Sequence, residues 1–83
     1  MNNKDEFEKL AALSVLNAEE SYTEIYGILD DNNDIFGLSF ATYNRLSDYY
    51  KSVVTKAMVS ENFETVEELR EAFGDKTADA LTA

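Results

Sequence analysis

The chain of 83 residues contains no cysteine, histidine, proline or tryptophan. Without cysteine there is no disulfide scaffold, and without cysteine and histidine there are no thiolate or imidazole ligands for a transition metal. Catalytic schemes that use Cys or His as nucleophile or base are excluded as well. Because no serine or threonine has a histidine to activate it, we expect the protein not to be an enzyme and to need no cofactor.

Long apolar runs are also missing. A membrane-spanning helix needs about 20 apolar residues in succession, and the longest uninterrupted apolar stretches here are only a few residues long. The first residues, Met1 to Glu6, include acids where a secretory signal would carry basic residues. We therefore expect a cytoplasmic location, which would be the host cytoplasm for a phage-encoded protein.

Positive charge is scarce, with 7 Lys and Arg against 17 Asp and Glu, and the formal net charge is −10. Such a field repels nucleic acid and anionic membrane surfaces. Affinity for DNA comes mainly from the neutralisation of phosphates, and three cations of the central segment, Arg45, Lys51 and Lys56, are too few for that. We expect neither direct nucleic-acid binding nor membrane binding.

What the sequence does have is helical periodicity. Hydrophobic residues make up 45% of the chain, which is enough for a small core, and no alternation of period two continues for more than three or four residues. The pattern predicts an all-α fold, a small four-helix bundle with short connections. The helices are expected at about 5–16, 18–29, 39–60 and 65–73, in a single domain over 1–74 with a loosely ordered tail over 75–83.

The first two predicted helices are separated at Asn17. Asn17 with Glu20 three residues later resembles a capping arrangement at the start of a new helix. The alternative is one continuous helix over 5–29, since asparagine is a poor helix former rather than an absolute stop.

Three other residues predict helix ends. Ser39 is expected to cap the third helix, and Thr65 with Glu68 fits a capping box at the start of the fourth. Gly74 stands where a C-terminal cap belongs.

The acidic residues gather in two blocks on either side of the third predicted helix. From Leu10 to Asn44 there are six acids and no basic residue, and from Glu61 to Asp75 there are six acids and one arginine. In the third helix, three cations outnumber one acid. We expect these cations to pair with carboxylates of the flanking helices. Even complete pairing leaves ten carboxylates unpaired, which indicates that the acidic surface has a use.

The acidic loop after the second helix resembles the opening of a calcium-binding loop. Asp30, Asn32 and Asp34 fit its first positions, but Ile35 stands where glycine is needed and Ala41 where a bidentate glutamate is needed. We therefore expect a solvated acidic turn and no metal site.

One function hypothesis is a small inhibitor or regulator that presents carboxylates to a basic, nucleic-acid-handling protein. Carboxylates one helical turn apart have a spacing of the order of that between backbone phosphates. The composition is similar to that of small acidic phage-encoded inhibitors, although the chain carries no family motif. The expected partner-binding residues are Glu19, Glu20, Glu24, Asp30, Asp31, Asp34, Glu64, Glu67, Glu68 and Glu71.

The alternative is a structural, assembly or chaperone-like module that binds through the aromatic third helix. Arg45, Tyr49 and Lys56 are expected on its less apolar side, and exposed tyrosine and arginine are residues that anchor interfaces. A homodimer through this face would add buried area to a small core.

Overall fold

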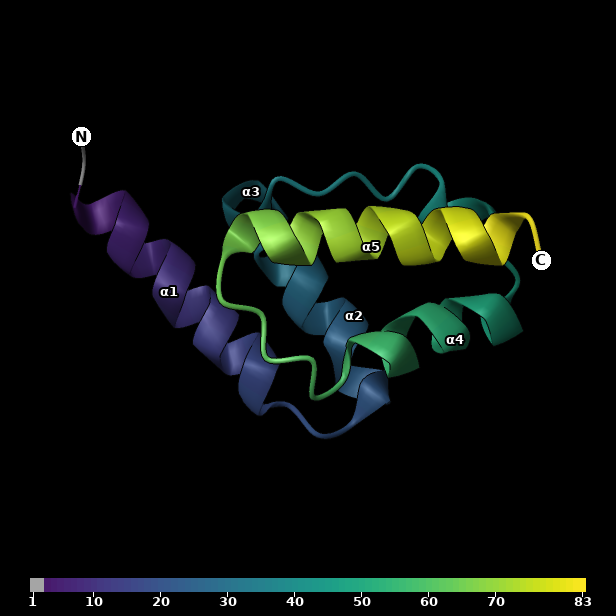
Figure 1. Ribbon diagram of the computed structural model, residues 1–83, viewed down its shortest axis with the longest axis horizontal. Helices are drawn as coiled ribbons and strands as arrows, with labels where there is room; N and C mark the ends of the chain where they lie inside the picture. Colours follow the sequence, from purple (N-terminus) through teal and green to yellow (C-terminus); the bar gives the residue numbers. More distant parts are fainter. Residues whose placement is uncertain (1–2) are drawn as a thin grey trace.

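In the computed structural model, which describes residues 3–83, helices joined by loops and turns make up the chain, and this part contains no strand (Figure 1). The predicted all-α fold is therefore confirmed, with four helices of seven residues or more and one short helix in the described part. The elements are α1 (Asn3–Ala18), α2 (Tyr22–Asp31), α3 (Asn33–Phe36), a 3-10 turn η1 (Tyr43–Arg45), α4 (Asp48–Met58) and α5 (Val66–Leu81). No helix in this range is long and apolar enough to span a membrane.

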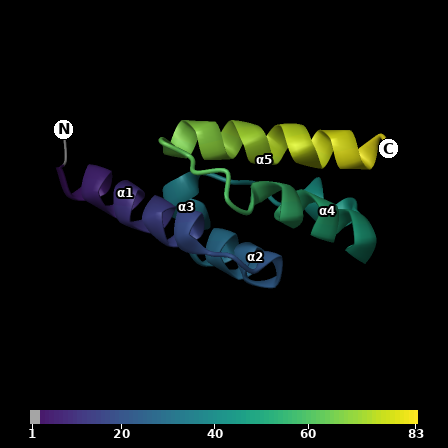
Figure 2. The same cartoon turned by 60° about the horizontal axis from the view of Figure 1, so that its bottom comes forward.

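The helices form an elongated body of 40 × 24 × 18 Å. α5 lies along α4, while α2 packs against α4 and α1, and the start of α1 and the end of α5 lie at opposite ends of the long axis (Figure 1). The N-terminal half of α1 projects beyond the other helices, as the second view also shows (Figure 2). The rest of the molecule therefore covers the side chains of that half of α1 less than it covers those of the other helices.

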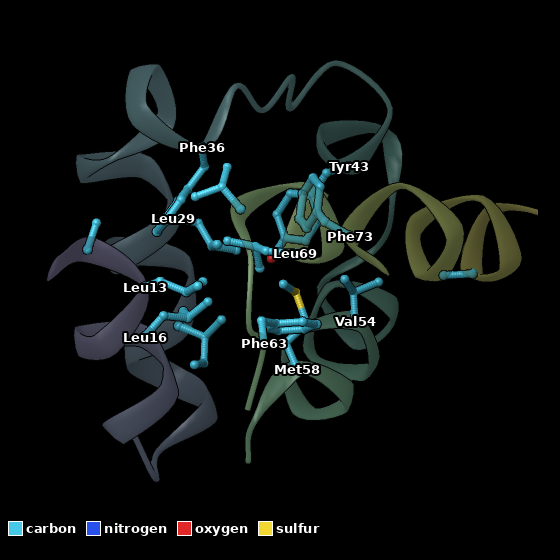
Figure 3. Close-up of a cluster of buried hydrophobic side chains, with 14 of the residues drawn as sticks. Leu13, Leu16, Leu29, Phe36, Tyr43, Val54, Met58, Phe63, Leu69 and Phe73 are labelled. Carbon is cyan, nitrogen blue, oxygen red and sulfur yellow. The ribbon is translucent and has the colours of Figure 1, made fainter. Parts of the chain in front are cut away.

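The core collects side chains from all five α-helices (Figure 3). Full burial of a side chain the size of valine, leucine, methionine or phenylalanine stabilises the folded state by about 1.5–3 kcal/mol. Leu69 of α5 lies between the side chains from α1 to α3 and those from α4 and its flanks (Figure 3). The largest fully buried side chains are Phe36, Leu16, Ile25, Leu29, Met58, Leu69 and Val54.

Four aromatic rings extend this core toward the loop before η1. The ring centroids of Tyr26 and Tyr43 are 5.4 Å apart and the rings are stacked, whereas Phe40 and Phe73 meet edge to face at 5.6 Å. Phe40 also contacts Tyr26 at 5.3 Å. The cluster thus ties α2, the loop, η1 and α5 together, with ring geometries that add to the effect of burial.

The predicted helix over 39–60 is wrong in its first half. Residues 38–47 form loop, turn and η1, and α4 begins only at Asp48, with the Ser47 hydroxyl accepting a hydrogen bond from the Tyr50 amide. Packing of Phe40 and Tyr43 into the aromatic cluster fixes this segment, so tertiary contacts outweigh helix propensity. α4 ends at Met58 because Val59 is extended and Ser60 has a left-handed backbone, with φ of 63°.

The break between α1 and α2 is confirmed, but its position and its cap are not. α1 continues through Asn17 to Ala18, and the residue that precedes α2 is Ser21. Asn17 instead bonds across the molecule: its side-chain nitrogen donates to the Phe63 carbonyl at 2.8 Å, and its oxygen accepts from the Phe63 amide at 3.0 Å. One amide side chain thereby fixes the connection between α4 and α5 against α1.

The fourth helix is much longer than predicted. α5 runs through Gly74 to Leu81, so Gly74 is not a cap and residues 75–81 are helical rather than a loose tail. Thr77 and Ala80 are buried, and their packing outweighs the local cost of a glycine in a helix, about 1 kcal/mol. The acidic loop over 30–38 also differs from the prediction, because it contains the short helix α3, which ends at Gly37 with φ of 69°.

Candidate protein-binding surfaces

The outer face of α5 carries four carboxylates in one line. Glu68, Glu71, Asp75 and Asp79 are spaced by three, four and four residues, which places them on one side of a helix, and all four are exposed. Successive members are about 4.5–6 Å apart along the axis, and the line is about 16 Å long. These four residues are called the acidic ridge below.

The N-terminal end of the ridge is held by hydrogen bonds. The Thr65 hydroxyl accepts from the Glu68 amide at 3.1 Å, so the predicted cap is present. The Glu68 carboxylate accepts from the Glu64 amide at 3.1 Å, one residue earlier than in a standard capping box. Glu68 therefore stabilises the helix start as well as contributing charge. Glu64 and Glu67 lie exposed beside this end.

The two cations of α5 are placed differently relative to the ridge. The Arg70 Nε donates to the Phe36 carbonyl at 2.9 Å, which satisfies the end of α3, whereas Lys76 lines a groove together with Asp79 of the ridge and with Tyr50 and Val53 of α4. Among residues 5–83 the one ion pair joins Lys9 Nζ and Glu6 Oε1 at 3.7 Å, and both residues line a recess with Glu64 and Glu67, beside the N-terminal end of the ridge. The ridge therefore has no ion-pair partner within that range.

A shallow recess borders the ridge. It is lined by the carboxylates of Glu61, Glu68, Glu71 and Asp75 and by two less polar side chains, Phe63 and Ala72. Phe63 is held there by its hydrogen bonds to Asn17. Acidic walls around a partly apolar floor suit a long cationic side chain, which has an apolar stem and a charged head.

The other predicted acidic residues lie on separate parts of the surface. Glu19 and Glu20 are at the corner between α1 and α2, which both views place away from α5 (Figures 1 and 2). The Glu19 carboxylate accepts from the Ser21 amide at 3.1 Å, near the start of α2. Asp34 lines a different recess with Asp5 and Glu8. The exposed acids at the two ends of α2 are Glu24, Asp30 and Asp31.

These acids do not assemble a metal site in the part of the chain that the structure describes. No three carboxylates between residues 3 and 83 approach closely enough to hold one ion together. The acidic loop is also divided between two helices, because Asp30 closes α2 while Asp34 belongs to α3. The arrangement gives several electrostatic surfaces rather than one coordination centre.

Two of the three cations of the central segment, Lys51 and Lys56, lie over aromatic rings rather than beside carboxylates. The Nζ of Lys56 is 4.7 Å from the centre of the Tyr22 ring, and the Nζ of Lys51 is 5.8 Å from that of Tyr43. The expected pairing with flanking carboxylates is thus absent for residues 45–56. Burial raises the pKa of Tyr43 above its usual value of 10.0, and the nearby Tyr26 raises it further.

Of the predicted dimer face, Tyr49 and Lys56 share one exposed side of α4, and Tyr49 is 69% exposed. Val53, 40% exposed, lies between them. Arg45 is also exposed but belongs to η1, before the extended residues that precede α4. The three predicted residues therefore do not share one helix face.

The sequence pattern does not predict two features of the surface. Asp75 and Asp79 belong to the ridge and not to a loose tail, and the signal for this is the spacing of carboxylates every three or four residues, which continues through Gly74. The second is the outer side of α1, where Phe7, Leu10 and Val15 are more than half exposed. The sequence signal for this surface is that the apolar residues of α1 are spread too widely around the helix for all of them to face the core.

Comparisons of the chain with protein-family models, with curated proteins and with solved structures find no match. A functional assignment must therefore come from the geometry and the charge of these surfaces.

Proposed function

We propose that the protein is a small acidic inhibitor or regulator that binds a basic, nucleic-acid-handling protein through the acidic ridge. The observation that supports this most is the row of four exposed carboxylates along one side of α5. None of the four has an ion-pair partner among residues 5–83, and the Arg70 side chain is bound to the Phe36 carbonyl instead. An acidic surface that served only solubility would have no need to align its carboxylates along one helix face.

The ridge has features of a nucleic-acid mimic. Its carboxylates repeat at about 4.5–6 Å along a straight axis, which is of the order of the spacing of backbone phosphates. A helix with a buried inner face holds them in place before binding, so little ordering is needed on association. The recess beside Phe63 adds a place for one lysine or arginine side chain of the partner.

The test is affinity capture from a cell lysate with the full chain, at about 0.05 M and 0.5 M NaCl. A ridge variant with Glu71→Lys, Asp75→Lys and Asp79→Lys is compared with a matched variant of equal charge change in and next to α2, with Glu20→Lys just before the helix and Glu24→Lys and Asp31→Lys within it. We expect a nucleic-acid-handling protein to be captured at low salt, released at high salt, and lost only from the ridge variant.

Two results would contradict the proposal. Equal loss from both variants would show that net charge alone attracts the partner. Capture that persists at high salt from the ridge variant would show that the acidic ridge is not the binding surface. A partner of the proposed class works in the cytoplasm, as a host protein would for a phage-encoded inhibitor, so we propose a cytoplasmic location.

One observation favours a second function, an assembly or chaperone-like module that binds an apolar surface. Tyr49 and Val53 form an exposed aromatic and aliphatic pair on α4. Binding through this pair would be insensitive to salt, would have a large negative heat-capacity change, and would be abolished by Tyr49→Gln but not by the ridge variant.

A further inference from the structure

The connector between α4 and α5, residues 59–65, has an unfavourable backbone at two positions. Ser60 has a φ of 63° and Asn62 a φ of 56°, on either side of Glu61, and within residues 3–83 no other residue except glycine is left-handed. In this conformation the Cβ of an L-residue crowds the following carbonyl oxygen, which asparagine tolerates better than serine. The local sequence therefore does not favour this conformation, and contacts with other parts of the molecule must hold it.

Asn17 of α1 makes such a contact directly after Asn62. Its amide nitrogen donates to the Phe63 carbonyl at 2.8 Å, and its oxygen accepts from the Phe63 amide at 3.0 Å. The Phe63 ring is buried and belongs to the core (Figure 3). Burial of the ring fixes the side chain, whereas the two hydrogen bonds fix the peptide groups on both sides of the Phe63 Cα. Without them, the backbone of residues 60–62 can relax while the ring stays in the core.

The connector also forms one wall of the recess beside the acidic ridge. Glu61 and Phe63 line the recess from the connector, and Ala72 and carboxylates of the ridge line it from α5. The α5 wall is held by the hydrogen bonds of a helix, whereas the connector wall is not. The position of Glu61 relative to α5 therefore depends on what holds the connector. Asn17 does not line the recess, so it acts on this wall through Phe63.

We propose that Asn17 is the positioning residue of this recess: through Phe63 it keeps the connector in its strained conformation, with Glu61 opposite α5. That a cationic side chain of a partner enters the recess rests on the proposed function. A wall that is ordered before binding raises affinity, because less conformational entropy is lost on association. The two hydrogen bonds require one donor and one acceptor on the same side chain, so an ionised aspartate at position 17 cannot make both.

Titration of the full chain with a hexa-arginine peptide in about 20 mM NaCl, followed by NMR of the backbone amides, tests the proposal. In the unsubstituted chain we expect the amide signals of Glu61 and Phe63 to shift together with those of the ridge. Asn17→Ala and Asn17→Asp should each raise the Kd for the peptide about threefold or more and remove the shifts at residues 61 and 63. The matched control is Ile25→Ala, which lowers stability from a buried position in α2 and should leave the Kd unchanged.

Asn17→Asp separates positioning from charge. It adds a negative charge to the protein, so attraction by charge alone would keep or lower the Kd for a cationic peptide. A Kd in Asn17→Asp no higher than in the unsubstituted chain, an equal rise in Ile25→Ala, or no binding of the peptide at all would overturn the proposal. Shifts at the ridge without shifts at residues 61 and 63 would also overturn it, but would leave the proposed function, which is tested by capture of the partner, untouched.

A second variant tests the strained connector without altering Asn17. Ser60→Gly should raise the midpoint of thermal unfolding by about 2–6 °C, because glycine adopts a left-handed backbone without a steric penalty. The control is Glu61→Gly, in the same connector but without a left-handed backbone, which should lower the midpoint. A lower midpoint in Ser60→Gly, or the same change in both variants, would show that the connector is not strained and would overturn the proposal.

Discussion

At the scale of single residues, Asn17 has the largest structural role for its size. It is partly buried, and its side chain satisfies both backbone groups of Phe63, which is 46 positions away in sequence. A helix-interior asparagine is unfavourable for α1 by itself. The long-range pair therefore explains why an amide, rather than a better helix former, is accommodated at this position.

Asn17→Ala should lower the free energy of unfolding by about 2–3 kcal/mol, because it removes two hydrogen bonds and leaves the Phe63 backbone groups without partners. Urea unfolding at pH 7 measures the change. The control is Asn44→Ala, at an exposed position, for which a change within about 0.5 kcal/mol is expected. A loss of less than 0.5 kcal/mol in Asn17→Ala would show that water replaces the amide without cost.

The three glycines should respond to alanine with opposite signs. Gly37 has a left-handed backbone and a Cβ there would lie 2.9 Å from an Arg70 nitrogen, so Gly37→Ala should cost about 1–2 kcal/mol. Gly27 and Gly74 are helical with nothing within 4 Å of an added Cβ, so alanine should stabilise by about 0.5–1 kcal/mol at each. Thermal unfolding of the three variants distinguishes the signs, and destabilisation by Gly74→Ala would contradict the described course of α5.

Tyr43 should make the fold sensitive to alkaline pH. Burial raises the pKa of its phenol above 10.0 in the folded chain, with a further contribution from Tyr26, so the unfolded state releases this proton first. The stabilisation is complete below about pH 10 and is lost as pH rises through the folded pKa. Urea unfolding at pH 8 and 11 measures how much of the free energy of unfolding is lost at high pH. The loss should be smaller in Tyr43→Phe than in the exposed control Tyr49→Phe. Equal losses in the two variants would contradict this role of Tyr43.

At the scale of helices, the sequence correctly predicts those features that depend on residues close together in the chain. The apolar periodicity of α2 and the Thr65 cap of α5 are local, and both are in the structure. The unpredicted features depend on contacts between distant residues: Phe40 with Phe73, and Asn17 with Phe63. Helical spacing continues from 40 to 58, and spacing alone does not distinguish one helix from a turn followed by a helix.

The candidate surface was predicted in part for the same reason. Glu68 and Glu71 follow a recognisable cap, so their place on a helix could be inferred. A glycine such as Gly74 is a local signal for a helix end, so the local pattern does not place Asp75 and Asp79 on the helix. What carries the helix past Gly74 is the burial of Thr77 and Ala80, a tertiary effect that no local pattern reveals.

At the scale of the whole molecule, self-repulsion dominates the electrostatics. The chain has a net charge of −10, and among residues 5–83 it has one exposed ion pair, at 3.7 Å. Salt therefore screens much repulsion and very little attraction. NaCl at 0.5 M instead of 0.02 M should stabilise the fold by about 1 kcal/mol, which for a domain of this size raises Tm by about 4–8 °C. A lower Tm in high NaCl, measured by circular dichroism, would contradict this.

The end of α5 has a consequence for how the molecule moves. Asp75 and Asp79 lie in the C-terminal half of the helix, where the helix dipole disfavours negative charge, and no basic residue is present in the last turn. The turn that completes the ridge is thus also the one that opens most easily. Amide hydrogen exchange should be fastest there within α5, and a bound cationic surface should slow it, so that recognition of the partner would appear as the closing of a frayed helix end.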